Sequence, residues 1–136
     1  MNNLEQTLSI IKPDAVERNL SEEIKSEFEK NGFNILKEKK IKIEKSDAEK
    51  FYKVHQTKPF YNDLCDYLSS GPIVVMALEK ENAVADNRKL MGATDPKNAE
   101  SGTLREKYGI SIDKNSVHGS DSVENAKIEI NFFFTD

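Results

Sequence analysis

The stretch PIVVMALE, residues 72–79, contains the longest apolar run of this chain. The run itself, Ile73 to Leu78, is far too short to span a bilayer as a helix. It is rich in β-branched residues and follows a Gly-Pro pair, which is the pattern of a strand that begins after a turn. We therefore expect residues 72–79 to form a buried β-strand.

Two further strands are predicted before this one. LEQTLSII, residues 4–11, is expected to form a second buried strand that stops at the Lys12-Pro13 pair, because proline cannot donate a backbone hydrogen bond. Apolar residues then alternate with polar ones between Phe33 and Ile43, which indicates a half-exposed strand.

Helical signals lie between the strands and after them. Ser21 is the expected N-cap of a helix that stops at Gly32, and Ser46 with Glu49 forms an expected capping box. The predicted helices cover residues 21–32, 46–56, 60–71, 81–92 and 122–134.

A long polar segment interrupts this pattern between Ala93 and about Ser116. A loop of this length in a compact domain is usually either functional or disordered. The helix that follows is expected to be capped by Asp121 or Ser122.

Strands and helices therefore alternate in the order β-α-β-(αα)-β-α, followed by the long loop with a short strand and a last helix. The hydrophobic faces indicate a sheet covered on one side by helices. We predict an α+β fold, a ferredoxin-like sandwich with a four-stranded antiparallel sheet, formed by one domain over residues 1–136.

Composition restricts the class of protein. The net charge of −4 and the pI near 5.3 argue against a dedicated nucleic-acid site, which would usually be basic. The lysine-rich residues 37–45 are interrupted by glutamates and alternate with isoleucines, so we interpret them as the solvated face of an edge strand. One cysteine and no secretory segment predict a cytoplasmic protein with no disulfide and no membrane association.

Common signatures of phosphate and metal sites are absent from the sequence, which has no GxxxxGK[ST], GxGxxG, CxxC or HExxH motif. Cys65 has two interpretations, a nucleophile paired with a histidine or a small core residue on a helix. Arginine is rare, since only Arg18, Arg88 and Arg105 occur among the 20 basic residues. Arg88 and Arg105 are therefore candidates for bidentate contacts to an oxyanion, with ordinary surface residues as the alternative.

His118 is one of only two histidines, and it lies in NSVHGSDS, residues 115–122. A structural residue, a metal ligand and a catalytic group are all open interpretations of it. Small residues surround it, which leaves room for a ligand to approach. Glu129 follows eleven residues later in the predicted last helix. If that helix folds back along the strand of His118, Glu129 can hold one ring nitrogen and leave the other nucleophilic.

Five segments of the chain together resemble nucleoside diphosphate kinases. They are TLSIIKPDAVERN (7–19), SGPIVVMALE (70–79), NRKLMGATDP (87–96), SGTLREKYG (101–109) and NSVHGSDSVENAKIEI (115–130). The match runs in order through nearly the whole chain, and the N-x-x-H-G-S-D-S block is highly specific. The resemblance implies an enzyme that moves the γ-phosphate of a nucleoside triphosphate, mainly ATP, to nucleoside diphosphates. It further implies a magnesium-dependent ping-pong reaction through a phosphohistidine, which maintains NTP and dNTP pools.

The resemblance also implies roles for individual residues. The catalytic set implied by it is His118 as the phosphohistidine, with Glu129, Ser120 and Tyr52. The nucleotide-binding set implied by it is Lys12, Phe60, Leu64, Arg88, Thr94, Arg105, Ile112 and Asn115. Phe60 is the residue expected to stack on the base. Mg²⁺ is the implied cofactor, held mainly by the nucleotide phosphates rather than by protein ligands.

The partners implied are nucleoside triphosphates and diphosphates and further copies of the chain, as a tetramer or a hexamer. Two other classes of protein stay open at this level. One is an inactive nucleotide-sensing scaffold on the same fold, and the presence of the whole implied catalytic set argues against it. The other is a ferredoxin-like nucleic-acid binder, and the acidic pI argues against it.

Overall fold

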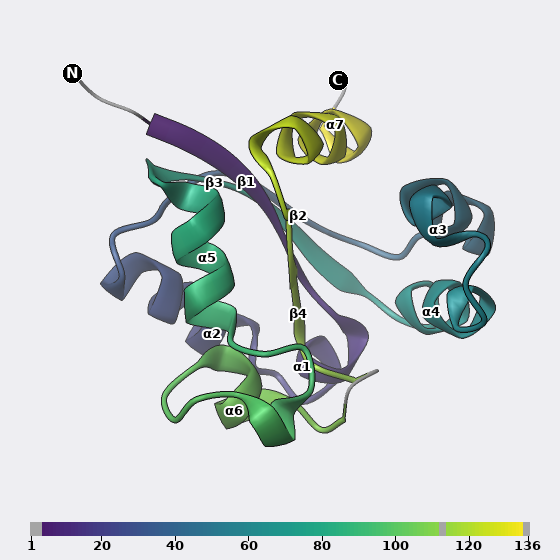
Figure 1. Cartoon of the computed structure of the whole chain (residues 1–136), viewed down its shortest axis with the longest axis horizontal. Coiled ribbons are helices and arrows are strands. Elements are labelled where there is room, and N and C mark those ends of the chain that lie inside the picture. Colours follow the sequence, from purple (N-terminus) through teal and green to yellow (C-terminus); the bar gives the residue numbers. More distant parts are fainter. Residues whose placement is uncertain (1–3, 112–113, 135–136) are drawn as a thin grey trace.

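The computed structural model describes residues 4–111 and 114–134, with one four-stranded antiparallel sheet at its centre (Figure 1). The strands are β1 (Leu4–Ile11), β2 (Asn34–Ile41), β3 (Ile73–Glu81) and β4 (Val117–Gly119), in the spatial order β2-β3-β1-β4. The long apolar run forms β3, which pairs with β1 on one side and with β2 on the other. The predicted buried strand and the predicted sheet are both confirmed.

The helices connect and cover these strands. They are α1 (Pro13–Glu17), α2 (Ser21–Lys30), α3 (Lys45–Phe51), α4 (Tyr61–Leu68), α5 (Ala83–Met91), α6 (Leu104–Tyr108) and α7 (Val123–Phe133), with 3-10 turns at Lys53–His55 and Pro96–Asn98. Within residues 4–111 and 114–134, no helix combines the length and the apolar character that crossing a membrane requires.

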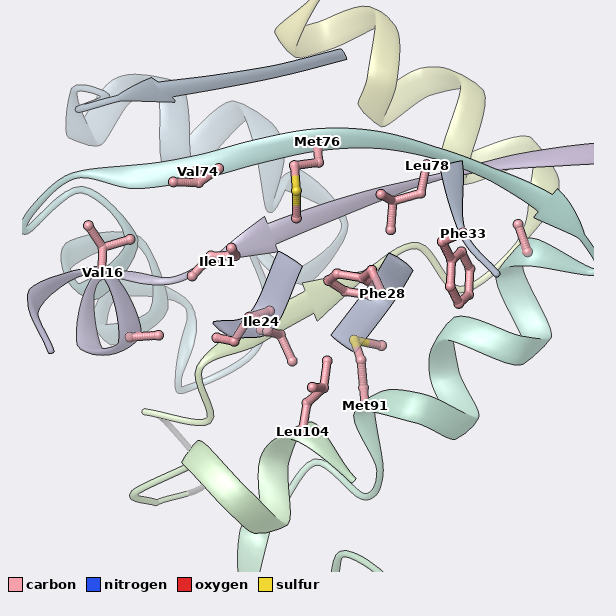
Figure 2. Close-up of a cluster of buried hydrophobic side chains, with 13 residues drawn as sticks. Ile11, Val16, Ile24, Phe28, Phe33, Val74, Met76, Leu78, Met91 and Leu104 are labelled. Carbon is pink, nitrogen blue, oxygen red and sulfur yellow. The ribbon is translucent and has the colours of Figure 1, made fainter. Parts of the chain in front are cut away.

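Helices cover both faces of the sheet, so the expectation of cover on one side is wrong. Val74, Met76 and Leu78 of β3 pack into a core with apolar residues of α2, α5 and α6, part of which Figure 2 shows. The alternate residues Ile73 and Val75 pack into a second core with residues of α3, α4 and α7. A continuous apolar run is what a strand buried on both faces requires, because every side chain then enters a core.

Residues at the ends of some helices were predicted correctly from the sequence. Ser122 is the N-cap of α7, and its hydroxyl accepts a hydrogen bond from the backbone N–H of Asn125 at 3.1 Å. Gly92 ends α5 with a φ of +84°, a conformation that side chains with a Cβ rarely adopt.

Two predicted caps are wrong by one or two residues. Helix α2 begins at Ser21 itself, and Leu20 stands at the cap position without a side-chain hydrogen bond. Helix α3 begins at Lys45 rather than after Ser46, and the Asp47 carboxylate accepts a hydrogen bond from the backbone N–H of Glu44 at 3.3 Å. Several neighbouring polar residues can serve as caps here, and the packing of each helix on the sheet selects among them.

The long polar segment after Gly92 is not entirely irregular, because it contains the five-residue helix α6. Thr103 caps this helix with its hydroxyl, and Leu104 is the residue that it buries in the core. A helix with one buried apolar side chain has no readable periodicity, which explains why the sequence did not predict it. This segment brings Arg105 back beside β4.

Candidate active site

His118 lies in the middle of β4, at the edge of the sheet, where its backbone pairs with Ile10 of β1. Its side chain is 20% exposed, and its Nε2 lies 3.2 Å from Oε1 of Glu129. Helix α7 packs against β1 and carries Glu129 to this position. A carboxylate accepts hydrogen bonds but donates none, so in the neutral imidazole Nε2 carries the ring proton and Nδ1 keeps its lone pair.

Ser120 supports the carboxylate from the residue after β4. Its hydroxyl donates to Oε1 of Glu129 at 2.7 Å and accepts a hydrogen bond from the backbone N–H of Leu8 at 3.1 Å. Ser120 is fully buried, so both bonds are shielded from water. The carboxylate that faces His118 is therefore held in place by a group fixed to β1.

Two aromatic rings lie beside the imidazole of His118. The Tyr52 ring centroid lies 6.4 Å from that of His118, and the Phe51 centroid lies 5.2 Å away. Burial raises the pKa of Tyr52, and the nearby Cys65 and Glu129 raise it further, so its phenol is neutral at physiological pH. Tyr52 was among the predicted site residues, whereas Phe51 was not.

Lys12, Asn115 and Thr94 meet although they lie far apart in the chain. The Nζ of Lys12 donates to Oδ1 of Asn115 at 3.0 Å, and the Nδ2 of Asn115 donates to the backbone carbonyl of Thr94 at 3.1 Å. Lys12 and Asn115 are both buried. Three of the predicted nucleotide-binding residues thus form one connected group.

The guanidinium of Arg105 lies beside β4 and points to two backbone carbonyls. Its two terminal nitrogens donate to the carbonyls of Gly92 and Val117, each at 3.0 Å. Burial lowers the pKa of Arg105 to about 10, and the neighbouring charge of Arg88 adds to this effect. The group is still protonated at neutral pH. The desolvated cation of Arg105 and the exposed cation of Arg88 line the same cavity, and together they favour an anion.

A cavity of about 790 Å³ joins these groups. The predicted residues that line it are Lys12, Tyr52, Phe60, Leu64, Arg88, Thr94, Arg105, Asn115, His118 and Glu129. Ser120 stands behind Glu129 instead of lining the cavity, and Ile112 lies outside the described residues. Phe60 is 44% exposed, which leaves its ring available for stacking, and His55 contacts it with centroids 5.9 Å apart.

Several lining residues were not predicted as site residues, among them Phe51, His55, Asp121 and Asn125. In the helix predicted for residues 46–56, the side chains of Phe51, Tyr52 and His55 share one face. Periodicity shows that residues share a face, but it does not show whether that face meets a core or a cavity.

Metal chemistry in this cavity would depend on few protein ligands. Across the described part of the chain, no group of three or more His, Cys, Asp and Glu side chains could hold a metal ion. Asp121 and Glu129 are carboxylates of the cavity lining, and Glu129 already contacts His118 and Ser120. Such a donor set fits Mg²⁺, which usually binds through one or two carboxylates, substrate phosphates and water.

Cys65 belongs to the core rather than to the site. It is fully buried on α4 and packs with Leu68 and residues of β3. Burial raises the pKa of its thiol, which disfavours the thiolate. The interpretation of Cys65 as a nucleophile is therefore wrong.

The fold and the cavity together define a protein that places three cationic side chains and an oriented imidazole in one cavity, and comparison with known proteins identifies its family. The model of the family described as nucleoside diphosphate kinase matches residues 5–136. Curated nucleoside diphosphate kinases from Nitratiruptor sp. and Campylobacter concisus are 61% and 60% identical over 131 residues, which is 96% of each chain.

Solved structures agree with these relatives. The nucleoside diphosphate kinase of Aquifex aeolicus superimposes with a TM-score of 0.95 at 38% identity, covering 96% of this chain and 95% of that one. The enzyme of Encephalitozoon cuniculi gives 0.94 at 37% identity, covering 97% and 90%. The chain belongs to the nucleoside diphosphate kinase family. It is a phosphotransferase that moves phosphate between nucleoside triphosphates and nucleoside diphosphates.

Proposed function

We propose that this transfer follows a ping-pong course in which His118 carries the phosphate between the two nucleotides. The observation that supports this most directly is the contact of Nε2 with Glu129, which leaves Nδ1 as the ring nitrogen with a free lone pair. The cations of Lys12, Arg88 and Arg105 line the same cavity as this ring.

In the first half of the reaction, Nδ1 of His118 attacks the γ-phosphorus of a bound nucleoside triphosphate. An N–P bond forms as the bond between this phosphorus and the β,γ-bridging oxygen breaks. The nucleoside diphosphate leaves with that electron pair. The Nε2–H group stays hydrogen-bonded to Glu129, whose negative charge stabilises the positive charge that develops on the ring.

In the second half, a terminal phosphate oxygen of another nucleoside diphosphate attacks the same phosphorus. The N–P bond breaks, and its electron pair returns to Nδ1. The attacking oxygen is already anionic, so no strong general base is required. Phosphoanhydrides are both consumed and formed, which makes the exchange nearly thermoneutral, and catalysis rests on positioning and charge stabilisation.

The binding roles are those that the family resemblance implies, and they are supported by the presence of these residues in one cavity. Arg88, Arg105 and Thr94 are proposed to hold the phosphates, and Lys12 with Asn115 to meet the phosphates and the sugar hydroxyl. When Mg²⁺ is bound, it neutralises phosphate charge, and Asp121 is the cavity carboxylate that remains available to it or to its water shell.

The base is proposed to lie against Phe60, with Leu64 and Ile112 as its apolar neighbours. Stacking on a ring does not require any particular hydrogen-bonding edge of the base, so we expect broad nucleotide tolerance. A tolerant enzyme with ATP as its main donor would maintain NTP and dNTP pools in the cytoplasm.

Labelling tests the phosphohistidine directly. We expect γ-labelled ATP with Mg²⁺ and no acceptor to label the protein stoichiometrically. The label should be labile to acid and stable to alkali, as a phosphoramidate is and a phosphoserine at Ser120 or Ser122 is not. Adding a nucleoside diphosphate should remove it. His118→Asn should lose label and turnover together while its urea unfolding curve stays that of a folded protein.

A homo-oligomer of four or six subunits is proposed from the family alone. Size-exclusion chromatography with light scattering at micromolar concentration measures it, and a monomeric mass would contradict it.

A further inference from the structure

The ring of Phe51 contacts the imidazole of His118, and no role has yet been assigned to Phe51. The two ring centroids lie 5.2 Å apart with an interplanar angle of 71°, which is an edge-to-face contact. Phe51 is the last residue of α3 and also lines the cavity. Its side chain carries no group for proton transfer or phosphate binding, so any effect on the reaction must act through the rings it contacts.

One hydrogen bond does not fix the plane of a ring. Glu129 holds His118 at a single atom, Nε2, and at a distance of 3.2 Å. The backbone gives limited help, because β4 has three residues at the edge of the sheet and His118 is followed by Gly119. A second contact, away from Nε2, is needed to keep the ring from tilting about its hydrogen bond.

Phe51 is itself held by the helix that carries Glu129. Its ring lies 5.9 Å from Phe132 and 5.3 Å from Phe133, and these residues follow Glu129 by three and four positions on α7. Residues spaced in this way share one face of a helix. A single face of α7 therefore reaches the imidazole in two ways, directly through Glu129 and indirectly through Phe51.

We propose that Phe51 is a positioning residue that fixes the plane of the His118 ring, so that Nδ1 is directed at the phosphorus while Glu129 holds Nε2. This proposal rests on the proposed role of His118 as the phosphate carrier. Near-attack geometry is sensitive to small tilts of the nucleophile, so loosening the ring should lower the rate of transfer more than it weakens nucleotide binding.

Phe51→Leu removes the ring contact and keeps an apolar side chain of similar size. Edge-to-face pairs contribute enough to change a rate about 2- to 10-fold, so we expect kcat to fall by about that factor. The KM for nucleotides should change less than about 2-fold. Ring nitrogen NMR should show a smaller fraction of the Nε2-protonated form of His118 than in the wild type.

Phe33→Leu is the matched control. Phe33 forms a similar edge-to-face pair with Phe28, at 5.6 Å and 84°, in the core on the other face of the sheet. It does not belong to the cavity lining. We expect Phe33→Leu to lower the free energy of unfolding at least as much as Phe51→Leu and to leave kcat unchanged. An equal fall of kcat in both variants would show general loosening and would overturn the proposal.

A double-mutant cycle with Glu129→Ala, which removes the hydrogen-bond acceptor at Nε2, decides whether Phe51 acts through the imidazole. If both residues position one ring, Phe51→Leu should have a smaller effect on kcat in the Glu129→Ala protein than in the wild type. Additive effects, or a wild-type kcat and wild-type ring NMR in Phe51→Leu, would refute the positioning role. Labelling of the wild-type protein is measured first, and absence of a phosphohistidine would refute the proposed function of His118. The ring NMR tests the contact between Phe51 and His118 separately from that function.

Discussion

Replacing Arg105 by lysine tests whether the planar guanidinium, rather than positive charge alone, is what the cavity needs. Two terminal nitrogens of Arg105 donate to the carbonyls of Gly92 and Val117, each at 3.0 Å. Gly92 closes the helix of Arg88, and Val117 precedes His118. The guanidinium therefore joins the end of α5, on the side of the cavity proposed to bind phosphates, to the strand that carries the imidazole.

The structure sets the size of the expected effect. Lysine keeps the charge, but a single ammonium on a flexible stem cannot satisfy both carbonyls and also face a phosphate. Hydrogen bonds from a charged donor contribute about 1.5–3 kcal/mol each, and we expect one such bond to be lost. Transition-state stabilisation should fall by the same amount, so kcat/KM should drop about 10- to 150-fold.

Burial adds a second expectation for Arg105. Its pKa is lowered to about 10 from 12.5, which means that the folded protein disfavours the protonated form. At neutral pH the free energy of unfolding is lowered by the full cost of burying this charge. The free energy of unfolding recovers only as the pH rises through about 10. A bound phosphate offsets this cost, so a nucleoside triphosphate should raise the unfolding midpoint of the wild-type protein at pH 8.

Steady-state turnover with ATP and a second nucleoside diphosphate gives kcat/KM, and urea unfolding gives the stability of each variant. Arg18→Lys is the matched control, because Arg18 donates to the backbone of Asp14 and Tyr108 outside the cavity lining. We expect it to lose stability without a comparable loss of kcat/KM. Wild-type kcat/KM in Arg105→Lys, or equal losses in both variants, would show that the argument from guanidinium geometry is mistaken.

Three further substitutions address other parts of the site. Phe60→Ala should raise KM for all nucleotides by similar factors, because stacking contributes about 1–3 kcal/mol for any base; a loss confined to one base in steady-state assays would contradict this. Ser120→Ala should cost about 1–3 kcal/mol in urea unfolding and slow phosphoenzyme formation, because the buried backbone N–H of Leu8 loses its partner and Glu129 keeps only its hydrogen bond with His118. Gly119→Ala should lower stability by about 1–3 kcal/mol, because the new Cβ would overlap the fully buried Asn87, and an unchanged unfolding curve would refute that packing.

Prediction from the sequence was accurate wherever the residues of one short segment determine the local structure. The apolar run of β3 and the Ser122 cap of α7 each depend on adjacent residues, and the structure agrees with both. Prediction failed where several local solutions are nearly equal in energy. Helix α3 uses Glu44 and Asp47 rather than Ser46 and Glu49, and these alternatives differ by a shift of two residues along the same polar segment.

The site shows the same division. The family resemblance carried by the NSVHGSDS block implied roles for His118 and Ser120, and the rarity of arginine made Arg88 and Arg105 candidates. Phe51 was not predicted as a site residue, because an aromatic residue on a helical face is usually part of a core. Its contact with His118 depends on how α3 packs against α7, and nothing in residues 46–56 reports that packing.

The longer strands and helices are properties of short segments, so they could be predicted from the order of residues alone, and the chemical groups available for phosphate transfer were implied by the family resemblance. The packing of helices on both faces of the sheet and the contact of Lys12 with Asn115 could not be predicted in this way. These two side chains are 103 residues apart, and they meet at 3.0 Å because β1 and β4 pair antiparallel, with Lys12 just after β1 and Asn115 just before β4. Contacts between residues this far apart form because whole faces of strands and helices are buried against one another. The free energy of that burial depends on the complete chain, so it is not encoded in any one segment.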